Sequence, residues 1–153
     1  MQASMDVCEA GVLSMHEALE PGITENGLWA KLHETNIRLG GEWIETRLLS
    51  SGPRTNPWFR ECSMRQIEKG DMVSFDTDLI GPYGYCSDIS RAWVCGEKPN
   101  NEQRHLYAKA FEQIEHNISV LKAGMTFREV SEKCWQIPDE FLANRYTTLI
   151  HGV

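Results

Sequence analysis

The hydrophobic pattern of the first 40 residues predicts two amphipathic helices. Apolar residues recur at helical spacing over residues 4–19. Pro21-Gly22 interrupts this pattern, and Thr24 can cap a second helix that extends to about Leu39. Gly40-Gly41 is expected to end that helix, because glycine readily adopts the left-handed conformation found after helix C-termini.

After residue 42 the pattern changes to alternation, which predicts strands. A first strand is predicted over residues 43–48, and Ser50–Cys62 is expected to form a loop because it contains one glycine and two prolines. Two strongly β-like runs follow at residues 72–80 and 85–95. The residues between them, Gly81-Pro82-Tyr83-Gly84, are typical of a hairpin turn.

The last third of the chain again has helical periodicity. Residues 101–123 carry one apolar stripe that predicts a long helix ending at Gly124. Thr126 and Glu129 have the spacing of a capping box, which predicts the start of another helix that stops before Pro138.

Two short segments of the chain resemble each other. Gly22 and Thr24 recur as Gly124 and Thr126, an offset of 102 residues (124 − 22), each after a helix and before another. A unit used twice indicates pseudo-symmetric halves, although a match this short also has chance as an explanation. The apolar run up to Val153 lacks a polar tail, so we expect the chain to be a fragment of a longer protein.

The composition is that of an ordinary globular protein and excludes several classes. Of 153 residues, 41% are hydrophobic and 24% are charged, with a net charge of −7. The acidic balance argues against a nucleic-acid partner, which requires clustered lysine and arginine. Neither an 18-residue apolar run nor a secretory signal pattern is present, so we expect no membrane partner and a cytoplasmic location. The five cysteines include no CxxC spacing, which favours reduced thiols over a disulfide framework.

Three aspartates in the predicted hairpin are the central chemical feature. If the turn is centred on Tyr83, opposite residues have numbers that add up to 166, so Asp88 lies across from Asp78 with Asp76 diagonal to it. Opposite Cβ atoms in such a pair are only about 4.5–5.5 Å apart. Three crowded carboxylates repel one another unless they are protonated or bind a cation, so the pattern indicates one or two divalent metal ions.

Three aspartates at this spacing also have other interpretations. An EF-hand loop starting at Asp76 would place Gly81 correctly but would have Ile80 and Ser87 at ligand positions. A glycosidase carboxylate pair and solvated surface carboxylates remain alternatives. His151 lies in an apolar run, where a core histidine and a metal ligand are both reasonable interpretations.

The aspartate hairpin followed by the distant His151-Gly152 resembles the pita-bread metallohydrolases, which include methionine aminopeptidase, Xaa-Pro aminopeptidase, prolidase and creatinase. The resemblance implies an α+β pita-bread fold with pseudo-two-fold halves, present here as an incomplete fragment. Residues 1–153 would then be a partial catalytic domain truncated at the C-terminus and also at the N-terminus. In that family two strand aspartates, one histidine and two later glutamates hold a binuclear metal site.

Two features resemble one branch of this fold in particular, the dimethylsulfoniopropionate lyases. The peptidases usually separate their two aspartates by eleven positions, whereas Asp88 follows Asp78 by ten and Asp76 by twelve. The loop around Trp58 also lacks the histidine with which Xaa-Pro peptidases contact their substrates. The phrase GDMVSFDTDLIGPYGYCSDISR, residues 70–91, carries the same resemblance.

The lyase branch implies a reaction and a set of site residues. Dimethylsulfoniopropionate, a small-molecule substrate, would be cleaved to dimethyl sulfide and acrylate by β-elimination. The general base and both glutamate ligands would lie beyond Val153, and the full-length protein would be a homodimer. Iron is the implied metal, with manganese, zinc and cobalt as alternatives. The metal ligands would be Asp76, Asp78, Asp88 and His151, and Trp58 and Tyr146 would contact the substrate.

Two other functions remain open at this point. The runner-up is an Xaa-Pro aminopeptidase or dipeptidase, in which a metal-activated water attacks the peptide carbonyl. The third is a non-catalytic binding or scaffold protein, against which the retention of all three aspartates argues.

Overall fold

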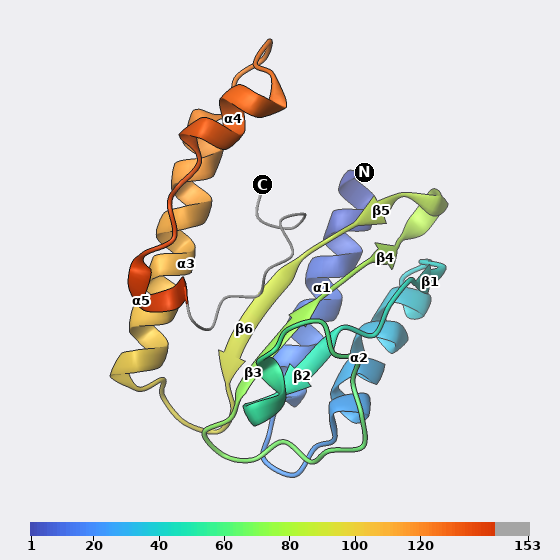
Figure 1. Ribbon diagram of the computed structural model, residues 1–153. Coiled ribbons are helices and arrows are strands. Elements are labelled where there is room, and N and C mark those ends of the chain that lie inside the picture. The colour runs from blue at the N-terminus through green and yellow to red at the C-terminus, as the bar shows by residue number, and fades with distance from the viewer. Residues whose placement is uncertain (143–153) are drawn as a thin grey trace. The chain divides into compact units, whose positions relative to one another are not determined.

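The computed structural model describes residues 1–142 (Figure 1). The chain divides into two compact units, Met1–Lys98 and Pro99–Val153.

Two helices cover one face of the strands in the first unit (Figure 1). They are α1 (Gln2–Ala18) and α2 (Glu25–Arg38), which confirms both predicted N-terminal helices. Thr24 caps α2 as predicted, since its hydroxyl accepts a hydrogen bond from the Gly27 N–H (3.0 Å). The helices cross closely at Gly11, where an added Cβ atom would lie 2.5 Å from Leu32 Cδ1.

The strands form two small antiparallel sheets. One sheet has the order β2-β3-β6 and the other β1-β4-β5. Two 3₁₀ turns, η1 (Gly52–Thr55) and η2 (Pro82–Gly84), follow β2 and β4. The bounds are β1 (Trp43–Ile44), β2 (Leu49–Ser51), β3 (Met72–Asp76), β4 (Leu79–Ile80), β5 (Cys86–Ser87) and β6 (Ser90–Val94).

The predicted strand boundaries were wrong in two places. The strand expected over residues 43–48 ends at Ile44, and the next strand begins only at Leu49. Both long β-like runs are also broken, because regular pairing stops after Asp76 and resumes at Leu79. Side-chain hydrogen bonds join the remaining backbone ones there: Thr46 Oγ1 donates to Asp78, and Thr77 Oγ1 accepts from the Ile89 N–H.

The predicted register of the hairpin is confirmed over its whole length. Asp76 pairs with Ser90 and Met72 with Val94 in one sheet, and Leu79 pairs with Ser87 in the other. In all these pairs the residue numbers add up to 166. Across the break between the sheets the register is therefore unchanged.

The core lies between the helices and one face of this hairpin. Val73, Phe75, Thr77 and Leu79 are buried, whereas the even-numbered residues between them are partly exposed. Helix residues such as Met15 and Leu28 belong to the same apolar cluster as Phe75. The odd-numbered face therefore points toward the helices and the even-numbered face points away from them.

The second unit is helical in its described part. It contains α3 (Asn101–Val120), α4 (Phe127–Lys133) and α5 (Asp139–Leu142). The long helix is confirmed but ends at Val120, before the predicted end at residue 123. Helix α4 begins with the predicted Thr126–Glu129 capping box and ends at Lys133, before Pro138 as predicted. The apolar stripe of α3 is exposed, with Phe111 and Ile118 among its members.

The short internal resemblance is confirmed in backbone geometry. Gly22 and Gly124 both have positive φ, at 98° and 87°. Thr24 and Thr126 both cap the next helix through their side chains. The residue between the glycine and the threonine repeats as well: the Ile23 N–H donates to the Glu20 carbonyl and the Met125 N–H donates to the Lys122 carbonyl, both at 3.3 Å. The same helix–turn–helix unit is thus used twice, 102 residues apart.

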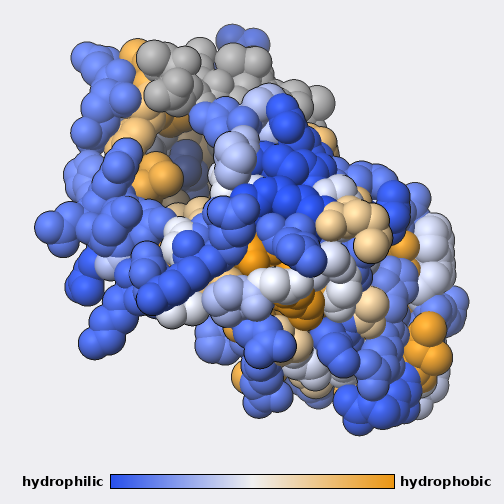
Figure 2. Space-filling view, turned by 90° about the horizontal axis from the view of Figure 1, so that it is seen from below, coloured by the Kyte–Doolittle hydropathy of each residue, from blue (hydrophilic) through white to orange (hydrophobic). Residues whose placement is uncertain are grey.

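One face of the molecule is mainly polar. The face shown in Figure 2 is largely hydrophilic, with apolar side chains in small separate patches. Among the helices of residues 1–142, none is long and apolar enough to cross a membrane.

Candidate functional site

The hairpin places all three predicted aspartates on its even-numbered face, away from the helices. Asp76 is the last residue of β3, Asp78 directly precedes β4, and Asp88 directly follows β5. Asp76 lies opposite Ser90. Leu79 pairs with Ser87 on one side of the two aspartates, and Thr77 is hydrogen-bonded to Ile89 on the other side. Asp78 and Asp88, which lie between these two pairs, are therefore opposite each other. The predicted juxtaposition of Asp78 and Asp88 is therefore confirmed at the level of backbone register.

Neighbouring hydroxyl groups orient two of these carboxylates. Ser90 Oγ donates to Asp76 Oδ1, across the β3–β6 ladder. Thr46 Oγ1 donates to Asp78 Oδ2 (2.9 Å), and the Asp78 carbonyl accepts from the Glu45 N–H (2.9 Å). Asp76 and Asp78 are half-buried, whereas Asp88 is exposed.

The donor set suits a hard divalent cation, because carboxylate oxygens are the ligands such ions prefer. Within residues 1–142, however, no three His, Cys, Asp or Glu side chains lie close enough together to hold a metal ion. Asp76, Asp78 and Asp88 could therefore supply oxygen ligands but do not by themselves enclose an ion. His151 and Tyr146 lie outside the described residues, so their roles stay predictions.

Trp58, the described residue of the two expected substrate contacts, differs in environment from Tyr83 of the hairpin turn. Trp58 follows η1 and is half-buried, with its ring edge-on to that of Phe59 (centroids 6.3 Å apart). Tyr83 lies at the tip of the hairpin in η2 and is 86% exposed. Trp58 is thus the less exposed of these two aromatic rings.

The face of the hairpin that points toward the helices carries a buried polar cluster behind the aspartates. The Cys8 thiol of α1 lies 3.4 Å from Thr77 Oγ1, and Ser4 Oγ donates to the Tyr85 carbonyl (2.6 Å). Burial raises the pKa of the Cys8 thiol and outweighs the hydrogen bonds with Thr77 and Ser87, which lower it; the nearby Asp88 adds to the increase. Cys8 is therefore a protonated packing residue, as expected for a reduced, buried thiol.

Sequence reasoning missed a second buried network, which is centred on Glu25. This glutamate lies in the first turn of α2 and is completely buried. Its carboxylate accepts hydrogen bonds from Ser51, Ser63 and Arg54. In the sequence Glu25 is an ordinary acidic residue after a helix cap, and its partners lie 26 to 38 positions away, so no local pattern indicates the network.

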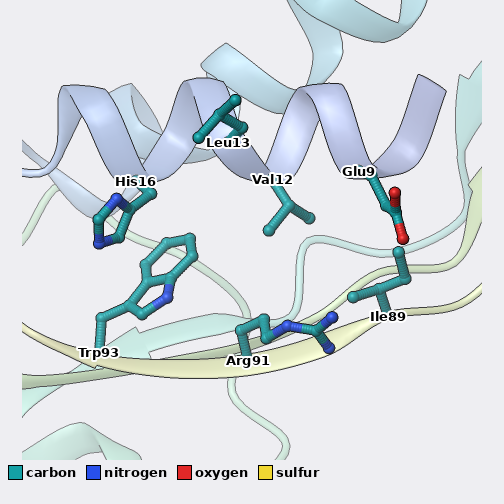
Figure 3. A pocket seen from close by; sticks show the side chains of 7 residues that line it. All are labelled: Glu9, Val12, Leu13, His16, Ile89, Arg91 and Trp93. Carbon is teal, nitrogen blue, oxygen red and sulfur yellow. The ribbon is translucent and has the colours of Figure 1, made fainter. Parts of the chain in front are cut away.

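A cavity of about 260 Å³ lies elsewhere, between α1 and β6 (Figure 3). Trp93 packs edge-on against His16 of α1, and Arg91 extends beneath Val12 toward Ile89. Ile89, Arg91 and Trp93 are odd-numbered hairpin residues, so the cavity lies on the helix-covered face. It is therefore separate from the face that carries the aspartates.

Comparison with known proteins assigns the chain to a family. The sequence model of metallopeptidase family M24 matches residues 1–153. The chain belongs to metallopeptidase family M24. This is a family of enzymes that generally depend on divalent metal ions, which agrees with the expected metal requirement in general terms.

Two curated relatives are lyases rather than peptidases. The chain is 47% identical to dimethylsulfoniopropionate lyase DddP of Roseovarius nubinhibens and 43% identical to that of Roseobacter denitrificans. Both matches cover 100% of this chain and 36% of the relative. The chain thus spans about a third of these proteins' length, and the expected resemblance to the lyase branch is confirmed.

Solved structures confirm the pita-bread fold. The prolidase from Pyrococcus furiosus superposes with a TM-score of 0.77 at 28% identity, over 84% of this chain and 38% of that protein. The Xaa-Pro dipeptidase from Bacillus anthracis gives the same TM-score at 26% identity, over 86% and 37%. The α+β fragment of a pita-bread domain that the sequence predicts is therefore what the structure contains.

Proposed function

We propose that this M24 chain is part of a metal-dependent lyase that cleaves dimethylsulfoniopropionate to dimethyl sulfide and acrylate. The observation that carries the proposal is the 47% identity to a dimethylsulfoniopropionate lyase over the whole of this chain. The arrangement of Asp76, Asp78 and Asp88 on one hairpin face supports it. We further propose that these three aspartates and His151 bind the metal, which we expect to be iron.

The chemistry required of the protein is modest. A base removes the proton from the carbon next to the substrate carboxylate, and the electron pair of that C–H bond forms the C=C bond. The C–S bond breaks, and dimethyl sulfide leaves with the electron pair of the C–S bond. A divalent metal supplies charge stabilisation for the substrate carboxylate. Asp76 and Asp78 would be held for this role by the hydroxyls of Ser90 and Thr46.

Aromatic side chains would bind the other end of the substrate. The sulfonium group is a cation without hydrogen-bond donors, so an aromatic ring face is a suitable partner, worth about 0.5–2 kcal/mol. Trp58 and Tyr146 are the proposed contacts. The general base is expected outside residues 1–153.

An Xaa-Pro peptidase is the second candidate. The likeness to prolidase and to an Xaa-Pro dipeptidase favours it, although at 26–28% identity rather than 43–47%. The loop around Trp58, which lacks a histidine, argues against it. The cytoplasmic location and the homodimer predicted above also stay predictions.

A direct test compares the two substrates. The full-length protein that contains this chain would be supplied with iron and incubated with dimethylsulfoniopropionate, with an Xaa-Pro dipeptide in parallel. We expect headspace dimethyl sulfide and no dipeptide cleavage. Dipeptide cleavage without sulfide release would replace the proposal with the peptidase alternative.

A further inference from the structure

The residues between Ser51 and Ser63, called here the 52–62 loop, are anchored at both ends by one carboxylate. Glu25 Oε1 accepts from the Ser51 N–H (2.9 Å) and from Ser51 Oγ (2.8 Å). Glu25 Oε2 accepts from the Ser63 N–H (3.0 Å) and from Ser63 Oγ (2.6 Å). A single side chain of α2 thus joins the start and the end of the loop.

Charge pairing makes this arrangement tolerable in the interior. A fully buried carboxylate is costly unless it is paired and hydrogen-bonded. Arg54, which lies within the 52–62 loop, forms an ion pair with Glu25 and also donates to the Glu61 carbonyl (2.9 Å). The charge of Glu25 therefore holds the interior of the loop as well as its ends.

A second ion pair supports the first. Arg65 Nη1 donates to Ser51 Oγ (2.7 Å) and to Asp71 Oδ2 (2.6 Å). The Arg65 carbonyl accepts from the Glu25 N–H (3.0 Å). The anchor is thus continuous with the turn that precedes β3.

The hydrogen-bond partners at position 25 require a carboxylate in particular. All the partners of the Glu25 oxygens described above are donors, and an ionised carboxylate is an acceptor only. Glutamine in the same place would direct its NH₂ group at the backbone N–H of either Ser51 or Ser63. One buried donor would then face another, which costs about 1–3 kcal/mol for each group left unsatisfied.

The loop also borders the strand that carries the candidate site. Glu61 forms an antiparallel bridge with Leu48, and the Leu48 carbonyl accepts from the Asp76 N–H (2.9 Å). Trp58, the proposed substrate contact, lies inside the same loop. The position of Trp58 relative to Asp76 therefore depends on how the loop is held.

We infer that Glu25 is a positioning residue that holds the 52–62 loop, and with it Trp58, in the geometry needed to bind the substrate. The substrate part of this inference rests on the proposed function. The anchoring of the loop does not, so the two can be tested separately.

Hydrogen exchange tests the anchor without reference to any activity. The full-length protein and its Glu25→Gln variant would be compared, with Glu34→Gln, an exposed glutamate on the same helix, as the matched control. We expect faster exchange in peptides covering residues 51–63 in Glu25→Gln only, with β3 and β6 unchanged. Unchanged loop exchange, or a uniform increase over the whole first unit, would overturn the inference.

Kinetics test the link to substrate binding. Because Trp58 would be misplaced while the metal ligands stay in place, we expect KM for dimethylsulfoniopropionate to rise about tenfold with kcat within about twofold. Metal content should stay at the wild-type value. A fall in kcat at constant KM would contradict a positioning role.

A milder variant covers the case in which Glu25→Gln does not fold. Ser63→Ala removes one hydroxyl donor and keeps the backbone N–H bond to Glu25. It should show the same changes in loop exchange and KM, but smaller, and wild-type values in both would overturn the inference. If the wild-type protein itself releases no dimethyl sulfide, the proposed function fails, and the exchange experiment still decides whether Glu25 anchors the loop.

Discussion

Thr77 and Ile89 are joined by two hydrogen bonds. In one of them the acceptor is the Thr77 hydroxyl, where a regular β-ladder would have the Thr77 carbonyl. The Thr77 N–H donates to the Ile89 carbonyl (3.2 Å), and the Ile89 N–H donates to Thr77 Oγ1 (2.9 Å). Regular strand pairing stops here, yet the register continues across the gap. Because Thr77 lies between Asp76 and Asp78, its buried hydroxyl helps to set the spacing of both carboxylates.

Replacing Thr77 by valine should therefore destabilise the hairpin. The substitution keeps the shape of the side chain but leaves the buried Ile89 N–H without an acceptor, a loss of about 1–3 kcal/mol in the free energy of unfolding. Denaturant unfolding of the full-length protein measures the change. Thr77→Ser keeps the hydroxyl and should remain close to wild type, so equal stability of the valine and serine variants would contradict this role.

Cysteine reactivity should follow burial. Burial raises the pKa of the Cys8, Cys62 and Cys95 thiols, so each holds less of the reactive thiolate than a free cysteine at the same pH. Cys86 is exposed. With an aromatic disulfide reagent at pH 8, we expect Cys86 to react rapidly and the three buried cysteines only after denaturation. Labelling of Cys8 at the rate of Cys86 would show that the cluster behind the aspartates is open to solvent.

Trp58 should contribute to substrate affinity through its ring. Trp58→Leu removes the aromatic face, so a cation–π contact of about 0.5–2 kcal/mol predicts that KM rises about 2- to 30-fold. Trp58→Phe should lie between leucine and wild type. Steady-state kinetics of the lyase reaction provide the measurement, and equal KM values for the three proteins would exclude Trp58 as a substrate contact.

The 153-residue chain expressed alone should bind metal weakly and be inactive. Its described residues contain no group of three ligands that could hold an ion. After incubation with iron and gel filtration, elemental analysis should find much less than one metal ion per chain. Stoichiometric, tightly held metal with turnover of the substrate would contradict the expectation that further ligands are needed.

Much of the fold follows from local rules in the sequence. The caps at Thr24 and Thr126 were predictable because a hydroxyl before a helical pattern satisfies free N–H groups. The hairpin register was predictable because the turn residues around Tyr83 indicate the turn centre. The break in strand pairing at Thr77 was not predictable. Threonine favours strands, and nothing in the local sequence shows that its hydroxyl replaces a backbone carbonyl as hydrogen-bond acceptor.

The sequence predicted only the part of the candidate site in which the spacing of the aspartates along the chain determines which face of the hairpin they share. In a register whose opposite residues add up to 166, two residues share a face only if their numbers differ by an even number. The separations of ten and twelve between Asp88 and its partners satisfy this rule, and a separation of eleven would not. Glu25 was missed because its role arises from residues brought together by the tertiary fold.

Metal content of an aspartate variant tests the central claim most directly. Asp88→Ala in the full-length protein would be compared with wild type and with Asp6→Ala, an exposed aspartate on α1, by elemental analysis after purification with iron. If the hairpin aspartates hold the metal, Asp88→Ala loses bound iron and dimethyl sulfide release, whereas Asp6→Ala keeps both. Unchanged iron in folded Asp88→Ala would contradict its role as a ligand and the site proposed here.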